Sequence, residues 1–85
     1  MDRIDIFVRE KDPDGRREIL EFLENMGYRL DEEEPRTRQE IIESVLPITV
    51  DRKNKEYRMM GNVTCAAAAV SSGRMITKEE LFNQF

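Results

Sequence analysis

Few side chains in this sequence could carry out chemistry by themselves. The 85 residues include one cysteine, Cys65, and no histidine. An internal disulfide is therefore excluded, and the commonest metal ligand and general base is missing. Cys65 is expected near the start of a helix, where the helix dipole would lower its pKa, so one hypothesis is a single redox or sensing thiol. The hypothesis we favour is structural: the small side chains of 65–69 let a helix approach a sheet closely.

The acidic and sulfur-containing pairs do not form a convincing catalytic or metal site. Asp12 immediately precedes a predicted helix, and nothing nearby in the sequence supplies the second acid or base that hydrolysis would need, so we interpret it as an N-cap. Met59 and Met60 are adjacent on a predicted strand and would face opposite sides of it, which argues against a copper site. We expect no metal and no cofactor.

Composition narrows the possible partners and locations. The net charge of -4 argues against binding to nucleic acid, and no apolar run reaches the roughly 18 residues that a membrane span needs. We expect one cytoplasmic domain covering residues 1–85. The charge is uneven along the chain, with an acidic block at 31–34 and a basic group at Arg9, Lys11, Arg16 and Arg17. We interpret both groups as solvated surface.

The first half of the chain predicts a strand, a helix and a strand. Residues 4–8 are β-branched and aromatic and predict the first strand. Asp12 and Pro13 are typical of an N-cap and a first helical position, and Gly27 can close the helix in a left-handed conformation. Residues 28–30 predict a short second strand.

The second half predicts a helix, a hairpin and two further helices. Thr37 and Glu40 have the spacing of a capping box that opens a helix, and Pro47 ends it. Residues 48–50 and 57–59 flank a polar turn and predict a hairpin. A helix of small residues is expected from 62 to 73, and a second capping box at Thr77 begins the last one. This order predicts an α/β fold with helices flanking a mixed sheet, and an α+β sandwich is the alternative.

Several short motifs carry a family resemblance. Asp12-Pro13-Asp14-Gly15 stands where a Cys-Pro-Tyr-Cys motif would follow the first strand, Val45-Leu46-Pro47 where a Thr-Val-Pro motif carries a cis-proline, and Gly61-Asn62-Val63-Thr64 where a Gly-Cys-Asp-Asp motif opens a helix. With the element order, they resemble the glutaredoxin branch of the thioredoxin-fold superfamily. The resemblance implies a thioredoxin-like four-stranded mixed sheet, in the order 2-1-3-4, and a cis bond before Pro47.

The departures from that family decide the expected chemistry. Both redox cysteines are absent, and Val63 and Thr64 replace the aspartate pair that holds glutathione. Disulfide exchange needs an attacking thiolate, so no Cys-x-x-Cys activity carries over. We therefore expect a non-catalytic binding or regulatory module that engages a protein partner. The expected binding groove is lined by Arg9, Asp12, Leu46, Pro47 and Asn62.

Two alternatives remain open to experiment. One is a single-cysteine thiol redox or sensing protein that uses Cys65. The other is a metal- or arsenic-responsive relative, which the absence of clustered cysteines disfavours. The sequence gives no indication of the oligomeric state.

Overall fold

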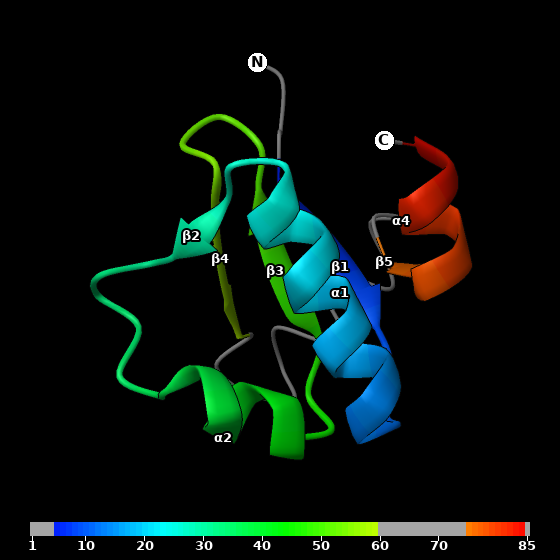
Figure 1. The fold of residues 1–85 in the computed structure, drawn as a ribbon, viewed down its shortest axis with the longest axis horizontal. Coiled ribbons are helices and arrows are strands. Elements are labelled where there is room, and N and C mark those ends of the chain that lie inside the picture. Colours follow the sequence, from blue (N-terminus) through cyan, green and yellow to red (C-terminus); the bar gives the residue numbers. More distant parts are fainter. Residues whose placement is uncertain (1–4, 60–74, 85) are drawn as a thin grey trace.

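A five-stranded mixed sheet organises the chain (Figure 1). The structure is a computed structural model that describes residues 5–59 and 75–84. The elements of the first half are β1 (Asp5–Arg9), α1 (Pro13–Asn25), β2 (Arg29–Leu30) and α2 (Arg38–Glu43). Those that follow are β3 (Ile48–Asp51), β4 (Glu56–Met59), β5 (Met75–Thr77) and α4 (Lys78–Gln84). The predicted α/β class is confirmed, while the helix expected at 62–73 lies outside the described residues.

The strand order differs from the prediction. The sheet runs β2-β4-β3-β1-β5, with β3 antiparallel to both β1 and β4, and with parallel pairs at the two ends. The predicted four-stranded order 2-1-3-4 is wrong because β2 pairs with β4 instead of β1. The Arg29 amide donates to the Lys55 carbonyl at 3.0 Å, and the Asp31 amide donates to Tyr57 at 2.9 Å. Both edges of β1 are taken, one by β3 and the other by β5.

The ends of α1 follow the local sequence signals. The Asp12 carboxylate accepts a hydrogen bond from the Gly15 amide at 3.0 Å, and this confirms the predicted N-cap. At the other end, Gly27 has a φ of +93°, a conformation that favours glycine. The Tyr28 amide donates to the Leu23 carbonyl at 2.9 Å, and the Gly27 amide donates to Glu24 at 3.1 Å. These two bonds form a Schellman motif, which turns the chain into β2.

The segment around α2 agrees with the prediction at its start and departs from it at its end. Thr37 and Glu40 form both bonds of the predicted capping box. The helix then ends at Glu43, so the prediction that Pro47 ends it is wrong, and Val45 beyond the helix is 60% exposed. No peptide bond among residues 5–59 and 75–84 is cis, so the cis bond predicted before Pro47 is wrong.

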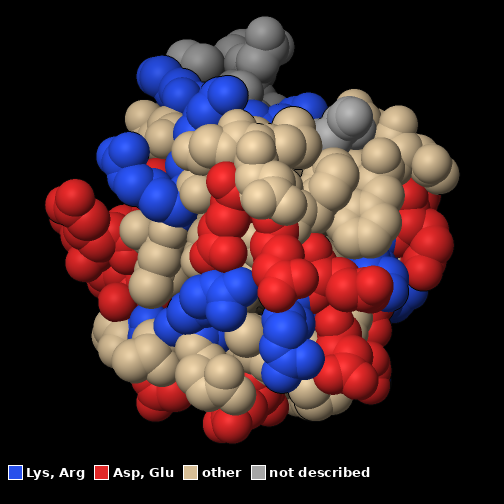
Figure 2. Space-filling view, in the orientation of Figure 1, with Lys and Arg blue, Asp and Glu red and all other residues tan. Residues whose placement is uncertain are grey.

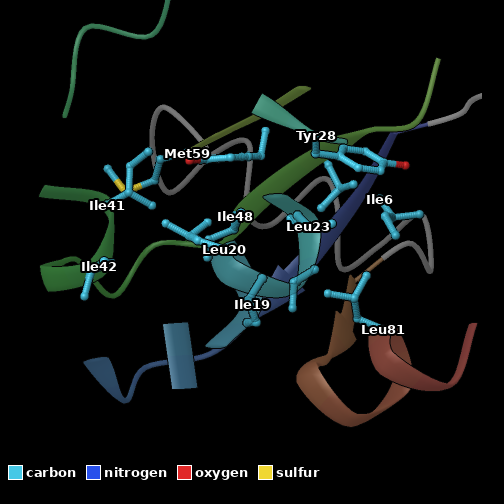
Figure 3. Packing of buried hydrophobic residues seen from close by; sticks show 13 residues of the cluster. Ile6, Ile19, Leu20, Leu23, Tyr28, Ile41, Ile42, Ile48, Met59 and Leu81 are labelled. Atoms are coloured by element: carbon cyan, nitrogen blue, oxygen red, sulfur yellow. The ribbon is translucent and has the colours of Figure 1, made fainter. Parts of the chain in front are cut away.

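The core lies between α1 and the sheet, and Figure 3 shows its side chains gathered around that helix. Alternate residues of the strands face α1, as strand geometry requires. The thirteen buried hydrophobic members of the core are Ile6, Val8, Ile19, Leu20, Leu23, Tyr28, Ile41, Ile42, Ile48, Val50, Tyr57, Met59 and Leu81. α4 closes the β5 side, where the rings of Phe82 and Phe22 pack at an interplanar angle of 45° with centroids 4.6 Å apart.

Candidate functional site

An open groove of about 750 Å³ lies between the loop that follows β2 and the β3–β4 hairpin. Its floor comes from side chains that alternate along the strands with core residues, so they extend from the sheet face opposite α1. The groove is lined by Asp31, Glu32, Glu33, Glu34, Pro35, Arg36, Asp51, Asn54, Glu56, Arg58 and Met59. None of these residues was predicted to form a site. The acidic block at 31–34 was the one feature of the sequence that drew attention to this region.

Asp31 fixes the loop where it leaves the sheet. Its carbonyl oxygen accepts a hydrogen bond from the Glu34 amide at 3.0 Å, which closes a tight turn. One carboxylate oxygen accepts from the Glu33 amide at 2.9 Å, and the other lies 3.5 Å from the Arg58 guanidinium. Asp31 therefore holds the shape of the loop and ties it to β4.

Glu34 anchors the loop a second time. Its side chain is only 2% exposed, and one carboxylate oxygen accepts the Met59 amide at 2.9 Å. The other oxygen accepts both the backbone amide and the guanidinium of Arg36, at 3.1 and 2.8 Å. The interpretation of the whole acidic block as solvated surface is therefore wrong for Asp31 and Glu34. It holds for Glu32 and Glu33, which are exposed.

The floor of the groove is an ion-pair network. Arg58 lies between the carboxylates of Asp31 and Asp51, at 3.5 and 3.8 Å. Asp51 also accepts the Lys53 amide at 3.0 Å, the Asn54 amide at 3.2 Å and the Asn54 side chain at 2.8 Å, and these bonds close the hairpin turn. Burial acts to raise the pKa of Asp51, but the hydrogen bonds and Arg58 outweigh it and lower that pKa.

The groove is strongly acidic. Among the residues that the structure describes, its lining contains six carboxylates and two guanidinium groups, an excess of four negative charges. The whole chain has a net charge of -4. Figure 2 looks onto the face that carries α1, where acidic and basic side chains are interspersed, and the floor of the groove extends from the opposite face of the sheet.

A second polar cluster lies on the α1 side of the sheet. Arg38 holds Glu24 through two bonds of 2.9 and 3.1 Å, and the Tyr57 hydroxyl donates to the same carboxylate at 2.5 Å. Burial acts to raise the pKa of Glu24, but the bonds from Arg38 and Tyr57 outweigh it and lower that pKa. Burial and the bond to Glu24 raise the pKa of Tyr57 above its ordinary value. The cluster joins α1, α2 and β4, so its arrangement is structural.

Arg16 is a buried residue that the sequence analysis placed on the surface. It is fully buried, and its guanidinium donates to the Ile41 carbonyl at 2.7 Å and to the Glu10 carbonyl at 2.6 Å. A third nitrogen lies 3.8 Å from the Met59 sulfur. Burial lowers its pKa, although the Glu10 charge opposes this. Arg16 therefore joins α2 and the segment after β1 to α1, and no sequence pattern marked it as buried.

The structure brings together part of the groove expected from the glutaredoxin resemblance. Arg9 is the last residue of β1, and Pro47 directly precedes Ile48, the first residue of β3, which pairs with Val8. Asp12 is used as the cap of α1. Pro47 is buried, Leu46 packs against the core, and Arg9 is exposed. Asn62 and Cys65 lie outside the described residues, so their expected roles stay predictions.

Within residues 5–59 and 75–84, no group of three or more histidine, cysteine, aspartate or glutamate side chains is placed to hold a metal ion. No helix in the described part of the chain is long and apolar enough to span a bilayer. Comparison of the chain with protein-family models, with curated proteins and with solved structures found no match.

Proposed function

We propose that this protein is a non-catalytic binding module that engages a protein partner. The observation that carries the proposal is the open groove, whose described lining has an excess of four negative charges in a chain of net charge -4. A charge that is gathered in one concave surface steers an oppositely charged partner and fixes its orientation.

The use of the ionisable side chains around the core supports a binding role. Glu34 holds a strand amide, Arg16 holds two carbonyl groups, and Glu24 is held by a guanidinium and a phenol. A general acid or base works best when its pKa lies near the operating pH. The lowered pKa values of Glu24 and Asp51 move these carboxylates away from neutral pH.

The glutaredoxin resemblance contributes a second surface to this proposal. Arg9 ends β1 and Pro47 directly precedes β3, which is antiparallel to β1, and this adjacency supports keeping the expected groove as a second candidate surface. The five-stranded order and the trans bond before Pro47 depart from the resemblance, so the proposal does not depend on common descent. The partner could contact either surface, and one experiment distinguishes them.

The test is site-specific photo-crosslinking in cells. A benzophenone amino acid is introduced at Glu33 in the groove, at Arg9 at the end of β1, or at Glu21 on the exposed side of α1. All three positions are exposed. We expect one discrete protein adduct from Glu33 or Arg9 and none from Glu21. No adduct at the first two positions, or the same adducts at all three, would overturn the proposal.

A further inference from the structure

We infer that the groove between the loop and the β3–β4 hairpin docks an extended, basic segment of the partner, with arginine or lysine side chains lying against Glu32 and Glu33. This inference rests on the proposed binding function and adds the chemistry of the partner. Three features of the groove carry it: its open form, the unequal use of its carboxylates, and the positive charge at the neighbouring turn.

The form of the groove suits a surface segment better than a small molecule. A volume of about 750 Å³ is in the range of ligand pockets, but the space opens widely to solvent. Small molecules bind best where most of their surface is buried, which an open groove does not provide. A polypeptide segment can bind with only one of its sides in contact with the groove. Its own side chains can then form charge-assisted hydrogen bonds with the groove.

The carboxylates of the groove are unequally engaged. Asp31 and Asp51 share Arg58, and Glu34 is held by Arg36. Glu56 lies 3.4 Å from Arg29. Glu32 and Glu33 are exposed, and their side chains bond to no other residue in the part of the chain that the structure describes. An incoming cation therefore meets two carboxylates at the rim that it can pair with and no internal bond that it must break.

The hairpin turn limits where the basic segment can lie. Arg52, Lys53 and Lys55 flank Asn54, which lines the groove. The Lys55 ammonium lies 5.9 Å from the centre of the Tyr28 ring, on the side of the turn towards β2. These cations repel a second cation at the turn. The positive side chains of the partner should therefore lie along residues 31–34, and its neutral or acidic continuation should lie next to the turn.

The test uses short fluorescein-labelled peptides in which arginine alternates with serine, and a matched set in which glutamate alternates with serine. We expect the arginine peptide to bind the full chain at low ionic strength, to weaken as salt approaches about 0.15 M, and to shift the amide resonances of residues 31–36 and 56–59. The glutamate peptide should not bind. The double variant Glu32→Gln, Glu33→Gln should bind about tenfold more weakly than the wild type.

A matched control separates the groove from the overall charge. Glu21→Gln, Glu79→Gln removes the same charge from exposed positions on α1 and α4, and it should leave the affinity within about twofold. Equal losses in both double variants, no binding of the arginine peptide, or resonance shifts elsewhere would each overturn the inference. A crosslinked adduct at Arg9 together with any of these results would leave the binding function standing and refute only the basic segment.

Discussion

The Glu34 carboxylate accepts the backbone amide of Met59 at 2.9 Å, and it thereby takes the place of a neighbouring strand. β2 pairs with β4 only as far as the Asp31 amide, which donates to the Tyr57 carbonyl. Beyond that point the chain turns away from the sheet. Leaving the Met59 amide without an acceptor would cost about 1–3 kcal/mol. The Glu34 side chain therefore supplies the hydrogen-bond acceptor that no backbone carbonyl of β2 provides at this position.

Glu34→Ala should lower the free energy of unfolding by about 2 kcal/mol, since it removes bonds from the Met59 amide and from Arg36 to a buried carboxylate. Glu34→Gln keeps an oxygen acceptor and should lose less. Urea denaturation measures both. The exposed neighbour is the control, and Glu33→Gln should change the stability by less than about 0.5 kcal/mol. Equal stabilities of Glu34→Ala and Glu33→Gln would contradict the role of Glu34.

Arg16→Lys should destabilise the chain by about 2–4 kcal/mol, because one ammonium group cannot reach both carbonyls that the guanidinium fork holds. The buried carbonyls of Ile41 and Glu10 would then compete for one donor. Chemical denaturation at neutral pH measures the change. Arg17→Lys is the matched control, because Arg17 is partly exposed and its ion pair with Asp14 lies at the surface. If the two variants unfold at the same denaturant concentration, Arg16 does not join these segments.

Tyr57→Phe should cost about 1 kcal/mol at neutral pH, since it removes the bond to Glu24 and keeps the buried ring. It should also change the alkaline behaviour. The pKa of Tyr57 is raised in the folded state, so its contribution to stability is complete below the unfolded value near 10.0 and decreases as the pH rises above it.

The pH dependence is measured by urea unfolding from about pH 8 to pH 11, with absorbance near 295 nm to follow phenol ionisation. The wild type should lose stability above pH 10 more steeply than Tyr57→Phe. Burial also raises the pKa of Tyr28, so a smaller loss should remain in the variant. Identical slopes for the two proteins would show that Tyr57 titrates as an ordinary phenol.

Asp12→Ala should destabilise the chain by about 1 kcal/mol, because the carboxylate accepts the Gly15 amide in the first turn of α1. Asp14→Ala is the comparison at the same end of the helix. Asp14 is exposed and pairs with Arg17 only at the surface, so its loss should cost less. Thermal and urea melts check the order of the two variants, and the reverse order would remove Asp12 as the principal cap.

Local signals in the sequence predicted both ends of α1 and the start of α2. The capping interactions involve only residues a few positions apart in the sequence, so the local chain determines their geometry. This holds for Asp12, for Gly27 and for the capping box of Thr37 and Glu40. The β3–β4 hairpin was equally predictable because its turn is short. The strand order was not, since β2 is only two residues long and its pairing partner is chosen by bonds to Lys55 and Tyr57, far away in the sequence.

The site was predicted poorly for a related physical reason. A run of four acidic residues does not indicate which members will be buried, and only the fold distinguishes Glu34 from Glu33. Arg16 could not be identified as buried either, because its partners are carbonyl groups, which every residue possesses. β5 was not predicted, because Met75–Thr77 is only three residues long and Thr77 was predicted to begin the last helix.

The double anchoring of the loop after β2 separates the residues that can vary from those that cannot. Asp31 and Glu34 fix the two ends of a four-residue turn, and the pair between them projects from the molecule without supporting it. Substitutions at 32 and 33 should therefore diversify freely under selection for a changing partner, while the fold stays intact. A library randomised at those two positions would yield mostly folded proteins, so new binding specificities could be selected from it without prior stabilisation.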